Sequence, residues 1–408
     1  AVAALVAVPP VAYYAAQRSR NAVAESWSRI GDLQALGNHD GVISKHFSTE
    51  RNTVLLIGSS GFVGVRIQQL LVEEAGHKAA FNLVCLDVNP PKQMREDMVY
   101  FSGDLRDSKQ LEEIYQAMKD RGYPIKGTFH LASIIPFVGV PESFIMRVNV
   151  DGVRESVEIA KKHGARGFLY TSSATCILDG ENDAPAEGVD EDAPYPKVNM
   201  DTYTTTKVAA EKIVSAAHSR DFYTAIVRPA GIMGPGDKVL YDKRSKGEDN
   251  VWIRGKGNGE CLLDMVGVDA VALGHIMALN ELLKVDGTLR KPQTTIMNLS
   301  AGKGIQYKQM IGSEAEKDGK NFWGHPPAQP VPAKVVQCLA FVNETWCNIF
   351  GKALLSPFLA RVSLNFTQRT YVFSNKRARD FLGWEPEDDD IRDTMRKYLR
   401  RDASHHKG

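Results

Sequence analysis

Short apolar runs alternate with longer segments of helical periodicity through the first 230 residues. The runs extend over four or five positions without a charge, as is typical of strands buried in a parallel sheet. They lie at Thr53–Ile57, Leu83–Leu86, Gly127–Leu131, Gly167–Tyr170 and Tyr223–Val227. Apolar residues three and four apart predict helices at Phe62–Glu74, Ser108–Asp120, Phe144–His163 and Tyr203–Ala217. Strands that alternate with helices of this length predict an α/β fold with a doubly wound parallel sheet.

The pattern becomes irregular after Gly231. Residues 236–262 are rich in Gly, Lys and Asp, and residues 301–332 carry clusters of Gly and Pro. We therefore expect a first domain over residues 51–235 and a smaller C-terminal lobe over residues 236–400, where a substrate pocket would lie. Elements of this lobe can cross back into the core of the first domain.

The N-terminal residues have a different character. Residues 1–17 carry no charge, and Arg18 and Arg20 follow them. This pattern indicates a membrane anchor or targeting segment with positive charge on its exit side. The run is shorter than the ~20 residues that span a bilayer, and Pro9-Pro10 interrupts it, so a cleaved or partial targeting segment and a packed apolar arm stay open. Residues 21–50 are polar and glycine-punctuated, which predicts a linker.

Composition narrows the possible partners. The 408 residues are 43% hydrophobic with a net charge of +1, which argues against a nucleic-acid partner. The odd, scattered set of cysteines indicates reduced thiols in a cytosol-facing protein, and its spacing predicts no metal site. The five are Cys85, Cys176, Cys261, Cys338 and Cys347.

A glycine-rich turn separates the first predicted strand from the first predicted helix. Gly58 permits a tight turn, Gly61 lets the backbone approach a pyrophosphate, and Gly64 lets the helix pack closely on the sheet. The helix N-terminus then faces the phosphates with the positive end of its dipole. The turn indicates a dinucleotide-binding Rossmann domain. Its candidate contacts are Gly58, Ser60, Gly61, Phe62, Val63 and Gly64.

Two carboxylates follow the next strands. Asp87 stands 23 residues beyond Gly64, at the end of the second strand. It can accept hydrogen bonds from the adenosine ribose hydroxyls and would repel a 2′-phosphate, which favours NAD over NADP. Asp104, followed by Leu105, can reach the adenine edge after a third strand.

Tyr203 and Lys207 lie four residues apart and so share one face of a predicted helix. A phenol has a reference pKa of about 10 and is a poor base at neutral pH. We expect the Lys207 ammonium and a positively charged nicotinamide to lower the pKa of Tyr203. Tyr203 could then accept an alcohol proton as hydride leaves the carbinol carbon.

Two serines end the strand before this helix. Ligands of open α/β sheets bind outside the carboxyl ends of the strands, so a hydroxyl there can hold the substrate oxygen beside Tyr203. Ser173 is the candidate, and Ser172 stays open as the alternative.

With these residues in place, the chain resembles the extended short-chain dehydrogenase/reductase superfamily, and within it the 3β-hydroxysteroid dehydrogenase and sterol-4α-carboxylate 3-dehydrogenase family. The similarity runs from about Asn52 to Tyr398. Besides the residues above, it includes His130-Leu131-Ala132-Ser133, Asn149-Val150-Asp151-Gly152, Arg228-Pro229-Ala230-Gly231, Gly234-Pro235-Gly236, Val268-Asp269-Ala270-Val271-Ala272, Tyr371-Val372-Phe373-Ser374 and Ala378-Arg379-Asp380-Phe381-Leu382-Gly383-Trp384.

The resemblance implies an NAD-dependent oxidoreductase acting on a steroid or sterol 3β-hydroxyl, with Ser173, Tyr203 and Lys207 as its catalytic set. It implies cofactor contacts at Ala132-Ser133 and near Pro229. It also implies that a 4α-carboxysterol would lose carbon dioxide after oxidation. Ile232-Met233 stands where the family often has Ile-Tyr, and Ala270 replaces its usual Asn. Both departures bear on the substrate.

An apolar helical pattern lies within residues 333–361. Val335, Leu339, Val342 and Trp346 recur at helical spacing, while Glu344 and neighbouring amides disfavour a spanning helix. The pattern predicts an interfacial helix that lets a sterol enter from the bilayer. A core helix and a dimer face stay open. The resemblance favours the endoplasmic reticulum membrane with a cytosolic catalytic domain, and a mitochondrial or other organellar membrane is the alternative.

Two other functions remain possible on this fold. A nucleotide-sugar epimerase or dehydratase would need groups for a diphosphate in the second lobe. An accessory subunit of a membrane complex would keep the nucleotide for structure alone. The fold also pairs often through long helices such as the one at Tyr203, so a homodimer is possible.

Overall fold

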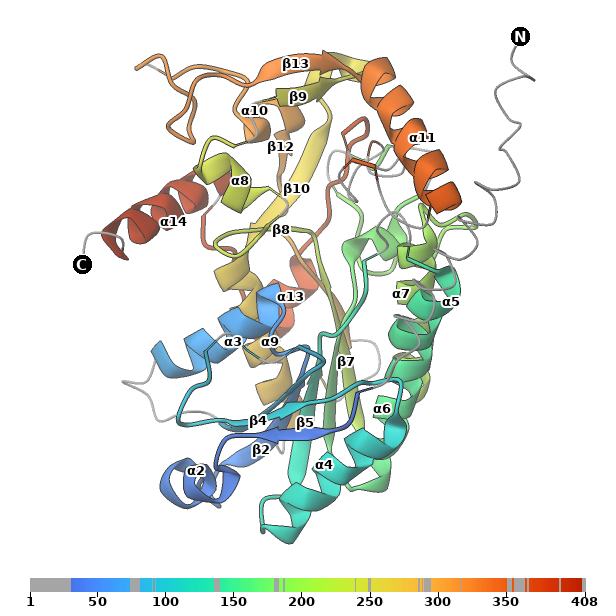
Figure 1. Cartoon of the computed structure of the whole chain (residues 1–408), viewed down its shortest axis with the longest axis vertical. Coiled ribbons are helices and arrows are strands. Elements are labelled where there is room, and N and C mark those ends of the chain that lie inside the picture. The colour runs from blue at the N-terminus through green and yellow to red at the C-terminus, as the bar shows by residue number, and fades with distance from the viewer. Residues whose placement is uncertain are drawn as a thin grey trace.

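The computed structural model describes residues 31–73, 81–89, 91, 93–135, 140–179, 183–185, 188–238, 240–248, 251–284, 287, 289, 295–316, 318–350, 354–355, 364, 367–388 and 390–405. An eight-stranded sheet forms the core of one half of the molecule (Figure 1). All neighbouring strands run parallel except β1, which is antiparallel to β4. The doubly wound parallel sheet is therefore confirmed. Its order is β1 (Gln34–Leu36), β4 (Val99–Ser102), β3 (Phe81–Asp87), β2 (Asn52–Ile57), β5 (Ile125–His130), β6 (Gly167–Thr171), β7 (Tyr223–Pro229) and β11 (Ile296–Leu299).

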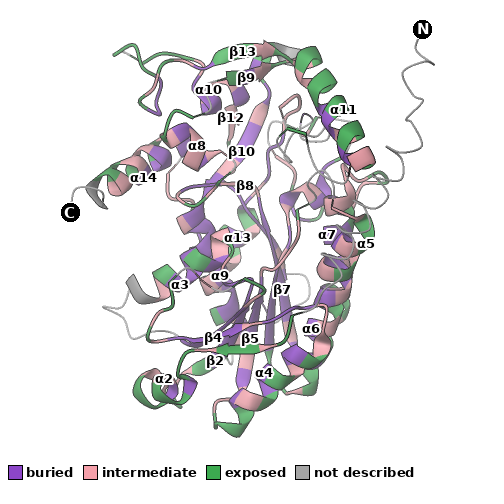
Figure 2. Ribbon diagram, viewed as in Figure 1, coloured by how far each residue is buried: buried purple, intermediate pink, exposed green. Residues whose placement is uncertain are grey.

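Helices cover both faces of this sheet because its central strands are apolar on both sides (Figure 2). In β2, Leu55 and Ile57 join one core cluster, while Val54 and Leu56 join the other. This is the alternation expected of a strand whose successive side chains point to opposite faces. The first cluster includes residues of α4 (Ser108–Asp120), α6 (Gly152–Lys162) and α7 (Thr202–Ala216); the second includes residues of α3 (Phe62–Glu73) and α9 (Val268–Leu283).

Part of the predicted linker is instead structured. β1 extends the sheet beside β4, and α2 (His39–His46) follows it. Asn38 caps this helix by accepting a hydrogen bond from the Gly41 amide, and the His39 imidazole lies 2.8 Å from the Tyr100 carbonyl oxygen. The prediction of a linker was therefore wrong for β1 and α2. It rested on polar composition, which does not reveal the contacts of these elements with β4. The predicted N-terminal anchor, residues 1–17, lies outside the described residues.

The helix predicted at Phe144–His163 is not continuous. It consists of α5 (Glu142–Met146), the π-helical turn η2 (Arg147–Asp151) and α6. The wider turn contains Asn149, whose side chain binds a neighbouring loop.

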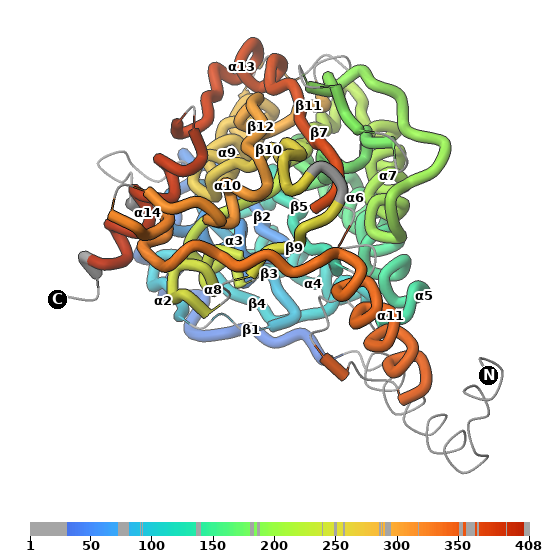
Figure 3. The backbone as a smooth tube through the Cα atoms, turned by 90° about the horizontal axis from the view of Figure 1, so that it is seen from above, coloured from blue at the N-terminus to red at the C-terminus, as the bar shows by residue number. Residues whose placement is uncertain are grey.

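A second lobe follows β7. Its three-stranded sheet has the order β12 (Gly304–Gln306), β10 (Leu262–Gly267), β8 (Gly231–Met233), and β9 (Val251–Arg254) pairs in parallel with β13 (Gln329–Pro332). Figure 3 shows α11 and α14 at opposite sides of this lobe. The chain crosses back to the large sheet at α9 and β11. The remaining elements are η3 (Ala174–Ile177), α8 (Tyr241–Ser245), η4 (Lys256–Gly259), α10 (Tyr307–Ile311), α11 (Ala333–Phe350), α13 (Lys376–Leu382) and α14 (Ile391–His405). None of the helices in the described ranges has both the length and the apolar character that crossing a bilayer requires.

Candidate active site

The turn between β2 and α3 is packed too tightly for side chains at two of its glycines. Gly58 has φ +88°, and a Cβ there would lie 2.7 Å from the Ala132 nitrogen. A Cβ on Gly64 would lie 2.3 Å from the Gly58 carbonyl oxygen. The helix α3 therefore begins directly against the turn, and no acidic residue stands in its first turn to compete with an anion.

Asp87 ends β3 and is fixed against the turn. Its carboxylate accepts hydrogen bonds from the backbone N–H of Ser60 at 2.9 Å and of Asn89 at 2.9 Å. Burial raises the pKa of Asp87, although these backbone donors act against that rise. Each carboxylate oxygen can accept a further hydrogen bond, as contact with two ribose hydroxyls requires.

Asp104 follows β4, but its carboxylate is already engaged. Arg106 binds it through Nε at 2.9 Å and Nη2 at 2.6 Å, and the Asp104 backbone N–H donates to Gln110 Oε1. Both charged side chains are about 10% exposed. Leu105 beside them is buried. The structure thus places these residues at the expected edge, and it adds Arg106 as a partner of Asp104 that no sequence motif predicted.

The loop after β5 lies against the glycine turn. The backbone N–H groups of Leu131 and Ala132 both donate to the Ile57 carbonyl oxygen. Two residues further on, Asn149 of η2 holds Ile134 by accepting from its N–H at 2.7 Å and donating to its carbonyl at 2.9 Å. Asn149 also donates to Thr206 Oγ1 at 3.1 Å, which links this loop to α7. The sequence motif contained Asn149, but only the π-helical turn shows what its side chain does.

The two candidate serines are not equivalent. Ser172 is buried, and its hydroxyl lies 3.4 Å from Cys176 Sγ. Ser173 is half-buried and shares a hydrogen bond of 2.9 Å with the Thr175 hydroxyl, which in turn accepts from Thr204 of α7. Ser173 is therefore the serine coupled to the helix that carries Tyr203.

Tyr203 and Lys207 lie on one face of α7 beside the end of β6. Lys207 is buried, and its ammonium donates to the Thr171 carbonyl at 2.6 Å. The ammonium lies 5.5 Å from the centre of the Tyr203 ring and 4.8 Å from that of Tyr170. Tyr203 as a whole residue is partly exposed at this edge.

The pKa values differ from the sequence expectation. Burial lowers the pKa of Lys207 to about 8, and the negative charge of Glu211 acts against this fall. Burial raises the pKa of Tyr203, although the Ser133 hydroxyl acts to lower it. In this structure desolvation of the phenol dominates and the Lys207 ammonium is directed at Thr171, so the lowering of the Tyr203 pKa by Lys207 together with a nicotinamide stays a prediction.

A buried ion pair fixes the far end of the same helix face. Glu211 follows Lys207 by one turn, and Arg228 of β7 binds it through Nε at 2.8 Å and Nη2 at 2.7 Å. The two side chains are 0% and 2% exposed, and the Tyr195 hydroxyl donates to the same carboxylate. Burial opposes the charge of Arg228, but its bonds to Glu211 outweigh this effect and raise its pKa.

The remaining cofactor candidate and two further histidines lie around this edge. Pro229 is buried at the end of β7, where β11 pairs with it. His275 of α9 contacts the Thr171 hydroxyl at 2.8 Å, and burial lowers its pKa to about 4. Burial also lowers the pKa of His130 to about 3, and neither of its ring nitrogens has a hydrogen-bond partner among the described residues. Both imidazoles are therefore neutral at physiological pH.

Comparison of the sequence with known proteins shows the family to which the chain belongs. The model of the 3-beta hydroxysteroid dehydrogenase/isomerase family matches residues 55–296. The sterol-4-alpha-carboxylate 3-dehydrogenase ERG26, decarboxylating, of Saccharomyces cerevisiae is 33% identical over 82% of this chain and 93% of its own length. The short-chain dehydrogenase/reductase family 42E member 1 of Bos taurus is 26% identical over 85% of this chain and 86% of its own.

Solved structures share the fold at lower identity. UDP-glucose 4-epimerase from Thermotoga maritima, solved with UDP-glucose, has a TM-score of 0.61 at 16% identity and covers 86% of this chain and 99% of its own. A short-chain dehydrogenase/reductase superfamily protein from Agrobacterium tumefaciens, solved with bound NAD, has a TM-score of 0.60 at 17% identity and covers 87% and 99%. At these identities the likeness concerns the fold alone.

Proposed function

Because the chain belongs to the 3-beta hydroxysteroid dehydrogenase/isomerase family, we propose that it oxidises the 3β-hydroxyl group of a steroid or sterol with NAD as the hydride acceptor. The chain is accordingly an oxidoreductase with the α/β fold of the short-chain dehydrogenases. Its substrate is a small lipid. We propose a 4α-carboxysterol, since the similar ERG26 protein is named for that reaction.

One observation carries this proposal. Tyr203 and Lys207 share a face of α7 at the carboxyl edge of the sheet, the same edge that holds the glycine turn between β2 and α3. A proton acceptor and a dinucleotide turn at one edge are what alcohol oxidation requires.

The residues at this edge fit NAD. Gly58 and Gly64 place no side chain at the two most closely packed positions of the turn, and the α3 N-terminus opens onto it. Asp87 lies at the end of β3 with lone pairs left for ribose hydroxyls, and its charge disfavours a 2′-phosphate. NAD, when bound, supplies the acceptor for the hydride from the carbinol carbon and a positive charge near Tyr203.

The side chains then have distinct roles. Ser173 holds the substrate oxygen, and Tyr203 takes its proton as the C–H electron pair leaves with the hydride. Burial keeps Tyr203 protonated in the resting site, so the added positive charge of the nicotinamide is needed to favour phenolate. Lys207 binds the ribose and is held in place by Thr171. A 4α-carboxyl group on the product makes it a β-keto acid, which loses carbon dioxide.

The test of this reaction is turnover in detergent with a 4α-carboxy-3β-hydroxysterol, followed at the reduced-nicotinamide absorbance. Release of carbon dioxide in equal amount to reduced NAD supports the carboxysterol. Oxidation of a 3β-hydroxysteroid without a 4-carboxyl group, and no reaction of the carboxysterol, would place the substrate elsewhere in the family.

We also propose that the protein works at the cytosolic face of the endoplasmic reticulum membrane. The support is α11, whose exposed side chains include Val335, Leu339, Val342 and Trp346. An apolar helix face of this kind suits the headgroup boundary of a bilayer, where the substrate dissolves. Membrane fractionation of cells tests the location, and recovery with mitochondria would favour the organellar alternative.

A further inference from the structure

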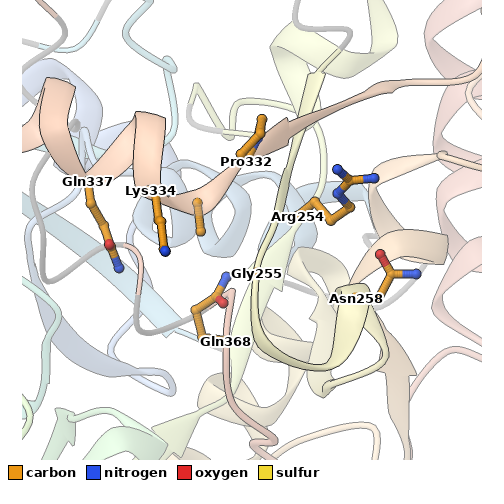
Figure 4. A pocket seen from close by; sticks show the side chains of 8 residues that line it. Arg254, Gly255, Asn258, Pro332, Lys334, Gln337 and Gln368 are labelled. Atoms are coloured by element: carbon orange, nitrogen blue, oxygen red, sulfur yellow. The ribbon is translucent and has the colours of Figure 1, made fainter.

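A polar pocket lies at the start of α11 (Figure 4), and none of its lining residues belongs to the candidate active site. Its volume is about 620 Å³. Arg254 and Pro332 are register partners at the carboxyl ends of β9 and β13, and α11 begins one residue later. Lys334 and Gln337 project from the first turns of the helix beside them (Figure 4). Gln368 completes the polar lining from a segment far along the chain.

The positive charge of this pocket has no acidic partner among the described residues. Arg254 and Lys334 are exposed, and neither forms an ion pair within the described part of the chain. Lys334 stands in the first turn of an 18-residue helix that has no acidic residue there. The helix dipole adds positive potential at this end of α11. A bound anion would therefore be stabilised both by the Lys334 ammonium and by the helix N-terminus.

The helix that borders the pocket carries a dense apolar surface. Seven of the thirteen large hydrophobic side chains that are exposed among the described residues lie between 335 and 355. Ala340, Asn343 and Cys347 form its buried face, so the exposed residues lie on other sides. Exposed apolar patches of this kind indicate sites that contact another protein or a membrane. The seven are Val335, Leu339, Phe341, Val342, Trp346, Leu354 and Leu355.

We propose that the pocket binds the headgroup of an anionic phospholipid while the apolar side chains of α11 enter the same leaflet. This inference rests on the proposed sterol function only for the presence of a bilayer. Charge complementarity selects the lipid. Arg254 and Lys334, which form no ion pair with the residues that the structure describes, stand beside the apolar face of α11, as in helices that lie on anionic membranes. Because the net charge of the chain is only +1, a preference for anionic lipid must come from local cations.

Vesicle flotation of the full chain tests the proposal. Vesicles of phosphatidylcholine alone are compared with vesicles in which part of it is replaced by phosphatidylserine. We expect tighter binding to the anionic vesicles. The double variant Arg254→Gln/Lys334→Gln should lose roughly thirtyfold in that binding, from about a fivefold effect for each cation, and keep the weaker binding to neutral vesicles.

A matched control separates the pocket from total charge. Lys109→Gln/Lys119→Gln removes two positive charges from exposed positions on α4, at the other end of the molecule (Figure 1). It should float like the unchanged protein. Equal loss in both double variants, or equal binding to both kinds of vesicle, would overturn the proposal.

Other occupants give different results. Self-association that is lost in Leu339→Gln, without vesicle binding, would make the helix face an interface between copies. Inorganic phosphate that stabilises the protein through Arg254 and Lys334, again without vesicle binding, would make the pocket a site for a soluble anion. Turnover in detergent is measured on the same preparations. Turnover without lipid selectivity removes only this inference, and lipid selectivity without turnover removes only the proposed reaction.

Discussion

Burial shifts the pKa values of Tyr203 and Lys207 in opposite directions, because it disfavours the charged form of each side chain. It disfavours phenolate in the first and ammonium in the second. Their spacing of four residues was evident from the sequence, but their desolvation depends on the fold, which brings Tyr170 and Thr171 of β6 against Lys207. The sequence could therefore predict the pair and not the pKa of either member.

The depressed pKa of Lys207 predicts a stability effect above neutral pH. The folded chain releases this proton near pH 8, whereas the unfolded chain keeps it up to about 10.5. The cost of burying the ammonium is thus fully present below pH 8 and disappears as the pH rises toward 10.5. Relative to Lys207→Met, the unfolding free energy of the unchanged protein should rise by about 3 kcal/mol across this window. Urea unfolding at a series of pH values measures it, and parallel curves would contradict the shift.

The Arg228–Glu211 pair predicts strong coupling between two positions. Arg228→Met leaves the Glu211 carboxylate buried without its cation, which should cost about 3–5 kcal/mol of unfolding free energy. Adding Glu211→Gln removes that charge and should restore part of the loss. Urea unfolding of both single variants and the double variant measures the coupling. Additive losses would show that the pair does not act as a unit.

At the level of elements, the regular strands and helices of the first domain followed from periodicity. The breaks did not. Nothing in the apolar spacing of residues 144–163 distinguishes the π-helical turn η2 from α-helix, because the turn is stabilised by contacts of Asn149 with Ile134 and Thr206. β1 and α2 were missed for the same reason: three residues of β1 pair with β4, which their own polar sequence does not reveal.

Because α3 lies so close to the glycine turn, adding a single methyl group at Gly64 should weaken cofactor binding. Gly64→Ala places a Cβ 2.3 Å from the Gly58 carbonyl, so α3 must move away from the turn and NAD binding should weaken at least roughly tenfold. Gly152→Ala is the matched control, because a Cβ there meets nothing closer than 3.5 Å and the residue has helical φ of −58°. That variant should bind NAD normally and gain about 0.5–1 kcal/mol of stability. Calorimetric titration with NAD measures both, and equal affinity in the two variants would contradict the close-packed turn.

At the scale of the whole molecule, the first domain and the second lobe differ in how much their sequences reveal. The strands β2, β3, β5, β6 and β7 of the large sheet were predictable because each is a continuous apolar run. The second lobe combines short strands from distant segments, such as β9 with β13, and its core contains large aromatic residues such as Tyr241 and Trp323. Its pocket beside α11 joins residues 254, 334 and 368, which no local pattern could connect.

Both halves of the molecule take part in the proposed reaction: NAD bound at the carboxyl edge of the large sheet would accept hydride from a lipid alcohol that the second lobe admits. Reduction of NAD by a 4α-carboxy-3β-hydroxysterol in detergent tests it most directly, with the unchanged protein compared to Tyr203→Phe and NAD binding measured for both. We predict turnover by the unchanged protein, a loss of at least about a hundredfold in kcat for Tyr203→Phe, and equal NAD affinity. Absence of turnover in both proteins, with NAD still bound, would contradict the dehydrogenase account and favour a subunit that keeps its nucleotide for structure.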